Sequence, residues 1–252
     1  MKLWMLFVAL PGLVLGQELS WPPKLPGGKT IGTGTSPKLL EPGPNLRSGV
    51  KIAKTPPRID FLYYPGQDYL GNPWSVWGES LCIGRKYYSA IGDHKGPEGN
   101  AFFYEYDSKT RKIRMLADMR KVLQLPAGHY TPGKIHSRID LGKDGWLYYS
   151  THRGSTRVTT TKHHFKGGWI LRTHPATSIT EIVVHAPLPM QTLPASVLDP
   201  ARMIYYAGTA DGDHKNNRVQ FLAYDVERNK VLYSDEHGFS RYAIFAKSTG
   251  RL

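Results

Sequence analysis

Short apolar and aromatic runs, separated by polar turns, recur along most of this chain. Three of these runs contain a Tyr-Tyr pair, at residues 87–88, 148–149 and 205–206, so that the second tyrosines lie 61 and 57 residues apart. A Gly-Asp-His-Lys turn follows the first pair and is repeated after the third. Runs of this length, rich in aromatic and β-branched residues, are typical of strands, and a period of this size indicates a repeated structural unit.

Each unit is predicted to contain four antiparallel strands, which is the pattern of a β-propeller blade. The predicted strands lie near residues 79–83, 86–91, 101–106 and 112–117 in the first unit, 134–141, 146–151, 169–173 and 181–185 in the second, and 195–198, 203–208, 220–225 and 230–234 in the third. Only residues 118–125 have the apolar spacing of a short helix. The predicted fold class is therefore an all-β, β-propeller architecture.

The two ends of the chain predict further features. Residues 1–16 read as a signal peptide, with Lys2 before an apolar run too short to span a bilayer. Residues 17–58 are rich in Pro and Gly and read as a linker or strap. Residues 59–252 would be a partial propeller, because 240–245 resemble the opening strand of a fourth unit. We therefore expect a secreted or periplasmic protein with no membrane span after signal removal, whose missing C-terminal blades lie in a longer parent.

Composition narrows the choice of partner. The chain has 33 Lys and Arg against 20 Asp and Glu, a net charge of +13. Export makes nucleic acid an improbable partner, so an acidic polysaccharide or a cell-surface glycan fits the charge better, although net charge is often only a solubility feature. The one cysteine, Cys82, cannot form an internal disulfide and is predicted to be a small buried strand residue.

Histidines mark the positions where chemistry is predicted. His136 lies at the entrance of an inner strand, and His94, His152 and His214 each follow a Tyr-Tyr strand. If the units are equivalent, these imidazoles share one rim and could bind a divalent metal or transfer a proton. The alternative is that a repeat simply copies its turn residues, leaving the histidines in water. The metal candidates are His94, His136, His152 and His214, and the cofactor is otherwise unknown.

A basic loop at residues 154–166 is inserted in the second unit only, and it contains no acid. Its charge would suit a carboxylate or sulfate group, although a solvated loop explains it too. The ligand-binding candidates are His136, Arg138, His152, Arg153, Arg157 and His163. Trp74 and Trp77 could stack against sugar rings, whereas Trp146 and Trp169 fit core strand positions better.

The common signatures of serine hydrolases, P-loop nucleotide enzymes and zinc proteins are absent: the sequence has no GxSxG, P-loop, HExxH or CxxC. Catalytic residues thus stay unassigned.

Residues 64–250 resemble an uncharacterised family of secreted bacterial β-propeller proteins. The segments that carry this resemblance are residues 72–78, 92–95, 128–157 and 196–200. The architecture is more distantly similar to oligogalacturonate-lyase-type propellers, in which histidines hold a divalent metal. Two hypotheses follow. The first is a propeller that binds a carbohydrate or other anionic ligand on its channel rim. The second is a metal-assisted lyase or hydrolase of an acidic polysaccharide, with Arg138 or Arg153 neutralising a carboxylate.

Overall fold

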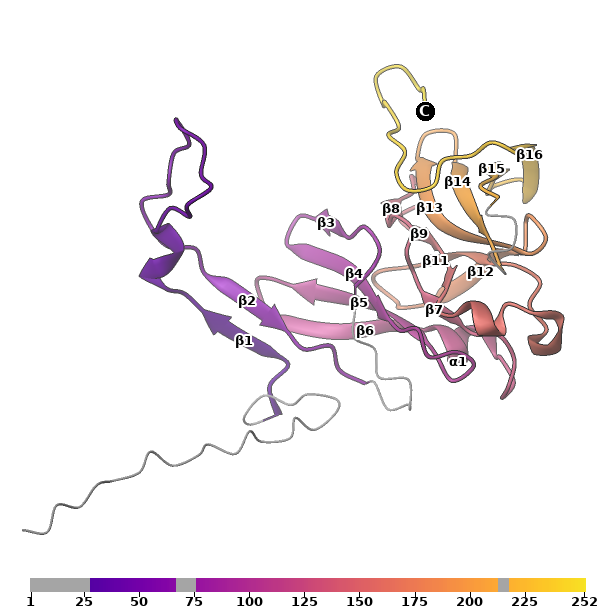
Figure 1. Cartoon of the computed structure of the whole chain (residues 1–252), viewed down its shortest axis with the longest axis horizontal. Coiled ribbons are helices and arrows are strands. Elements are labelled where there is room, and N and C mark those ends of the chain that lie inside the picture. The colour runs from indigo at the N-terminus through magenta and orange to yellow at the C-terminus, as the bar shows by residue number, and fades with distance from the viewer. Residues whose placement is uncertain (1–27, 67–75, 213–217) are drawn as a thin grey trace, which may run out of the picture.

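The protein is built from antiparallel sheets, three of which have four strands in the part of the chain described here. The computed structural model describes residues 28–66, 76–212 and 218–252, and Figure 1 shows the sheets following one another along the chain. The all-β prediction is confirmed.

The first sheet contains β3 (Leu81–Ile83), β4 (Lys86–Gly92), β5 (Ala101–Asp107) and β6 (Lys112–Asp118). The middle sheet contains β8 (Asp140–Leu141), β9 (Leu147–Ser150), β11 (Trp169–Thr173) and β12 (Thr180–His185). The third contains β13 (Gln191–Asp199), β14 (Ile204–Asp211), β15 (Phe221–Asp225) and β16 (Lys230–Asp235).

Two smaller ribbons complete the strands. β1 (Ile31–Gly34) pairs with β2 (Ile59–Leu62), and β7 (Pro132–Lys134) pairs with β10 (His152–Arg153). The β1–β2 ribbon lies beside the first sheet, in the indigo part of Figure 1. Tyr106 of β5 donates a hydrogen bond to Asp60 of β2 over 2.6 Å. The ribbon is thus attached to the first sheet by a charge-assisted contact.

The middle sheet is packed on both faces. Successive side chains of a strand point to opposite sides, so Tyr149 and Leu171 join the core shared with the first sheet. Tyr148 and Ile170, one position away, join the core shared with the third sheet. All four side chains are almost completely buried, which explains why the strands of this sheet read as continuous apolar runs rather than alternating ones.

The Tyr-Tyr pair does not occupy equivalent positions in the three sheets. To the sheet that follows it, the first sheet presents Tyr88, the second tyrosine of its pair, whereas the middle sheet presents Tyr148, the first of its pair. A shift of one residue moves a side chain to the opposite face of a strand. The repeat in the sequence therefore locates the strands correctly but misaligns the faces by one residue.

Several local expectations are corrected. Part of the 17–58 strap forms strand β1, because residues 31–34 find hydrogen-bond partners in β2. The expected strand at 134–141 is split between β7 and β8, which belong to different sheets. Cys82 is exposed, since β3 is a short edge strand. Residues 240–245 form no strand, and Ala246 and Arg251 share only an isolated bridge. Residues 1–16, which are predicted to be a signal peptide, lie outside the described part of the chain.

The short helix at 118–125 is confirmed as α1 (Met119–Leu123). Asp118 caps its first turn by accepting a hydrogen bond from the backbone of Lys121, and Gln124 ends it in the left-handed conformation. Three single-turn 3-10 segments accompany it: η2 (Pro37–Leu40), η3 (Thr156–Val158) and η4 (Thr161–His163). No helix within the described ranges combines the length and the apolar character that crossing a bilayer requires.

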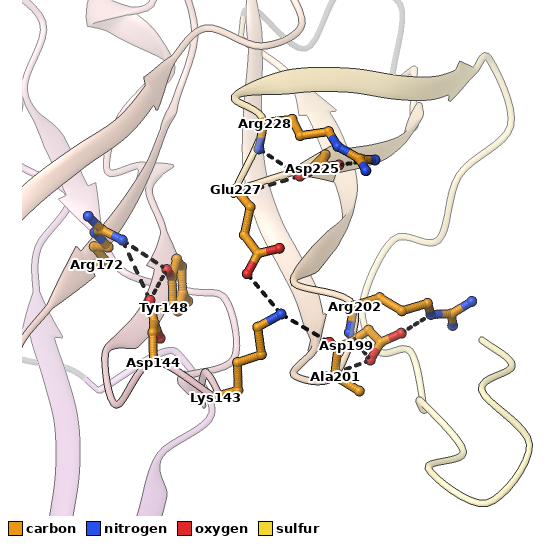
Figure 2. Close-up of polar contacts among 10 residues, drawn as sticks. All are labelled: Lys143, Asp144, Tyr148, Arg172, Asp199, Ala201, Arg202, Asp225, Glu227 and Arg228. Carbon is orange, nitrogen blue, oxygen red and sulfur yellow. Dashed lines mark hydrogen bonds and ion pairs between the residues drawn. The ribbon is translucent and has the colours of Figure 1, made fainter.

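Aspartates close the turns at one end of the middle and third sheets (Figure 2). Asp144 accepts a hydrogen bond from Tyr148 over 2.8 Å, and Asp225 accepts from the backbone nitrogens that follow it. Lys143 links the two sheets, because its Nζ lies 2.8 Å from the Glu227 carboxylate. Such turns match the polar hairpin signals in the sequence, and their capping fixes the end of the sheets away from the cavity described below.

Three glycines allow the backbone of three segments to meet at the other end. A Cβ on Gly133 would lie only 2.5 Å from the Cα of Gly154 and even closer to the carbonyl oxygen of Asp93. A Cβ on Gly92 would collide with the carbonyl of Gly133, which accepts a hydrogen bond from Asp93 over 2.8 Å. We call Gly92, Gly133 and Gly154 the glycine contact. Only residues without a side chain permit this approach.

Replacing Gly133 with Ala should lower the free energy of unfolding by about 2–3 kcal/mol, because the added methyl group forces the backbones of β7 and β10 apart. Gly43→Ala is the matched control: no atom lies within 4 Å of the added Cβ, so a change within about 0.5 kcal/mol is expected. Urea denaturation of both variants measures the difference. Equal stability of the two variants would show that the glycine contact is not tight.

Candidate functional site

A cavity of about 850 Å³ opens beside the glycine contact. Its lining comes from segments that are distant in sequence: the segment before β3, the turn after β4, β7, β10, the start of η3, β13, the end of β14 and the C-terminal segment. The described side chains that give it its character are Trp77, His94, Lys95, Lys134, His136, His152, Arg153, Arg157, Asp211, Arg218 and Arg241. Six of them are Lys or Arg, and Asp211 is the one acid among the described lining residues.

Lys134 is the most unusual member of the site. It is only 7% exposed, and its Nζ lies 4.2 Å from the ring centre of Trp77 in a cation–π contact. Within the described residues its Nζ has no hydrogen bond or ion pair. Burial, together with the charges of Arg153 and Arg241, lowers its pKa to about 8. A buried lysine without an acidic partner is energetically unfavourable, which makes Lys134 a candidate for the functional site.

His136 is held against the third sheet. Its Nδ1 lies 3.0 Å from the carbonyl oxygen of Pro194, and since a carbonyl only accepts, Nδ1 carries the proton. Burial lowers the pKa of His136, and the nearby charges of Lys134 and Arg241 add to the effect. The imidazole is therefore neutral at pH 7, with Nε2 as the acceptor nitrogen.

His152 and Arg153 also reach the third sheet. Nδ1 of His152 lies 2.9 Å from Oγ1 of Thr192, which in turn donates to the carbonyl oxygen of Ala210. Arg153 is 6% exposed and donates to the carbonyl oxygen of Asp211 over 2.6 Å. These contacts fix the guanidinium and the imidazole against the third sheet, so the β7–β10 ribbon supplies these groups and the third sheet orients them.

An aromatic cluster connects the histidines. The ring centres of His94 and Trp77 are 5.3 Å apart, those of Trp77 and His136 are 6.4 Å apart, and those of His136 and His152 are 5.5 Å apart. Burial and the charge of Lys134 lower the pKa of His94. Three of the histidines singled out in the sequence thus lie on one wall of the cavity.

Other predicted site residues are placed differently. Arg157 lines the cavity, but Arg138 does not: its Nε pairs with the Asp140 carboxylate over 2.9 Å. His163 ends η4, where its Nδ1 lies 2.8 Å from Oγ1 of Thr160, outside the cavity lining. His214 and Trp74 lie outside the described residues. Arg138 is therefore not placed to neutralise a ligand in the cavity, whereas Arg153 and Arg157 line it.

The four-histidine metal site stays a prediction. Across residues 28–66, 76–212 and 218–252, no group of three His, Cys, Asp or Glu side chains lies close enough to hold a metal ion. His94, His136 and His152 are neighbours through ring contacts rather than through nitrogens that converge on one point.

Four cations of the cavity were missed in the sequence: Lys95, Lys134, Arg218 and Arg241. Arg218 lies between two predicted strands and Arg241 in the segment expected to open a fourth unit, and only the tertiary structure brings them to the cavity. Lys134 did carry a signal, because it is a charged residue between Gly133 and Ile135 in a segment predicted to be a strand. A lysine at an inner strand position should be treated as a candidate site residue.

No family model matches the chain, and no curated protein matches its sequence. Among solved structures, the chain is similar to the β-propeller domain of the Trilobed protease from Pyrococcus furiosus, which is described as having an open velcro topology. The similarity has a TM-score of 0.36 at 8% sequence identity, and it covers 64% of this chain and 42% of that one. The chain thus spans less than half of this neighbour's length.

Replacing Lys134 with Met should stabilise the protein at pH 7. The unfolded lysine binds its proton more tightly than the folded one, so stability falls as the pH drops from about 10.5 to about 8. Removing the charge should raise the free energy of unfolding by about 1–3 kcal/mol at pH 7, and by much less at pH 10. Urea denaturation at the two pH values measures this difference.

The matched control is Lys95→Met, which removes an exposed lysine of the same cavity. Its effect should stay within about 0.5 kcal/mol at both pH values. If Lys134→Met lowered stability at pH 7, or if its effect did not depend on pH, the lysine would not carry an uncompensated charge.

Proposed function

We propose that the protein binds an anionic carbohydrate, or a closely related sugar acid, in the cavity beside the glycine contact. The observation that carries this proposal is Lys134, buried without an acidic partner among the cations of the cavity wall. A carboxylate or sulfate group would supply the negative charge that the described side chains do not.

Electrostatics favours such a ligand over a neutral one. The guanidinium groups of Arg153, Arg157, Arg218 and Arg241 line one cavity, and guanidinium binds carboxylate and sulfate groups through paired hydrogen bonds. Walls of low dielectric constant strengthen the attraction between these groups and an anion. Asp211, the one acid among the described lining residues of the cavity, already accepts a hydrogen bond from the backbone of Arg218 over 3.1 Å.

The shape and aromatic content of the cavity support a sugar. A volume of about 850 Å³ is within the usual range for small-molecule sites and accommodates a short oligosaccharide. Trp77 lines it and is 37% exposed, so part of its indole ring is available for packing against a sugar ring. Neutral imidazoles of His94 and His136 beside it provide polar contacts for hydroxyl groups.

We also propose that the sheets are blades of a β-propeller and that the protein acts outside the cytoplasm. Three successive sheets have the same strand order, and burial decreases from the first strand to the last in the third sheet. All nine residues of β13 are buried, whereas β16 is largely exposed. This gradient is expected when inner strands surround a common axis. The signal-like residues 1–16 support export, where acidic glycans are available.

Arg241→Gln should weaken binding of a galacturonate oligosaccharide about tenfold, because one charge-assisted contact is worth roughly 1.5 kcal/mol. Isothermal titration calorimetry at low and moderate salt measures the change. The matched control is Lys109→Gln, in the exposed turn between β5 and β6, which should bind like the unmodified protein. A neutral oligosaccharide of the same length should bind weakly to all three proteins. Equal affinity for the charged and the neutral sugar would contradict the proposal.

A metal-assisted lyase or hydrolase of an acidic polysaccharide is the second candidate. The observation that favours it is the row of imidazoles, with His136 and His152 only 5.5 Å apart between ring centres. In a lyase, cationic groups would neutralise the uronate carboxylate while a base removes the neighbouring proton.

If this second function holds, adding Mn²⁺ to the full-length protein should produce unsaturated sugar ends from polygalacturonate, detected by ultraviolet absorbance. His152→Gln should abolish the product and leave thermal stability within a few degrees. His163→Gln is the control, because His163 lies outside the cavity lining. If no product forms under any metal condition while sugar binding is intact, the lyase or hydrolase function is excluded and the binding function remains.

A further inference from the structure

We propose that Lys134 is a reactive amine that forms a reversible imine with a carbonyl-bearing anion held in the cavity. The proposal rests on the anion-binding function above and adds a covalent step to it. Its ligand class is a small anion with an aldehyde or ketone group, such as an oxidised sugar acid or an α-keto acid.

The surroundings of Lys134 favour a nucleophilic amine over a structural ion pair. The lysine side chain is almost fully buried, yet it lines the cavity and lies against the indole ring of Trp77. Its backbone is fixed because Lys134 pairs with His152 in the β7–β10 ribbon and follows Gly133 of the glycine contact. The amine is thus held at one place in the wall rather than moving on a flexible surface chain.

Burial and nearby cations favour a neutral, nucleophilic amine at this position. Apolar surroundings and adjacent positive groups are the two conditions that activate a lysine as a nucleophile. Lys134 meets both, because its side chain is 7% exposed, its Nζ lies 4.2 Å from the ring centre of Trp77, and it shares the cavity wall with Arg153 and Arg241. The charged and titratable groups around the same cavity are His94 and Lys95 after β4, His136 after β7, His152 and Arg153 of β10, Arg157 of η3, Asp211 of β14, Arg218 before β15, and Arg241 of the C-terminal segment.

The chemistry is a balanced condensation. The neutral amine adds its electron pair to the carbonyl carbon, and the carbonyl oxygen then leaves as water with the two amine hydrogens. The imine nitrogen can take up a proton, so the positive charge of Lys134 is retained. His136 is a suitable proton carrier for these steps, because it lines the same cavity and its Nδ1 is held by the Pro194 carbonyl, which leaves Nε2 as the acceptor nitrogen. The arginines hold the anionic group while the bond forms.

Reductive trapping tests the proposal on the full-length protein. Pyridoxal 5′-phosphate supplies an aldehyde and an anionic group, and cyanoborohydride supplies the hydride that reduces an imine to a stable secondary amine. Peptide mass spectrometry then measures the labelled fraction of every lysine. At limiting probe and pH 7, Lys134 should be labelled at least about tenfold more than Lys95, the exposed lysine of the same cavity.

Matched variants separate reactivity from charge. Lys134→Arg keeps the positive charge without a reactive amine, so it should lose the main label. Lys109→Arg, in the exposed turn between β5 and β6, should leave the labelling of Lys134 unchanged. Pyridoxal, which lacks the phosphate, should label Lys134 much less, and the oligosaccharide should compete with the phosphorylated probe.

Two results would overturn the inference, and they are distinguishable. If label spreads evenly over the lysines while the oligosaccharide still binds, Lys134 is not reactive and the binding function stands. If Lys134 reacts equally with pyridoxal and its phosphate, and no anionic sugar binds or competes, the anion site is wrong and the covalent step falls with it.

Discussion

The site depends on the close backbone approach of Gly92, Gly133 and Gly154. Each glycine is close in sequence to a group of the cavity: His94 lies two residues after the first, Lys134 follows the second, and Arg153 precedes the third. Because no Cβ separates the segments, the hydrogen bond from Asp93 to the carbonyl of Gly133 forms at 2.8 Å. A rigid backbone junction at this place lets side chains from three segments converge on one cavity.

The same junction explains how an unfavourable charge is retained. Burying Lys134 beside Arg153 and Arg241 lowers its pKa and opposes folding at neutral pH. The two large inter-sheet cores, each containing fully buried tyrosines and aliphatic side chains, offset this cost. The packed cores between the sheets therefore supply the stability, and the unfavourable buried charge of Lys134 lies at the end of the sheets beside the glycine contact.

The third sheet has a distinct part in this arrangement. Pro194, Thr192 and Asp211 accept hydrogen bonds from His136, His152 and Arg153, which belong to the neighbouring part of the chain. At the opposite end, the Lys143–Glu227 ion pair holds the same two parts together. The orientation of the imidazoles and the guanidinium is thus set by inter-sheet contacts, and a movement between these sheets would alter the shape of the cavity.

The sequence by itself determined the all-β class, most of the strand positions and the short helix at Met119–Leu123, because those features follow from local alternation, turn residues and capping. It also singled out His94, His136, His152, Arg153 and Arg157, since they flank strands and glycines. It placed Cys82 inside, which was wrong because the edge position of a strand depends on its neighbouring strands. The joining of Lys134, Arg218 and Arg241 in one cavity was decided only by the tertiary structure, because it results from contacts between segments that are distant in sequence.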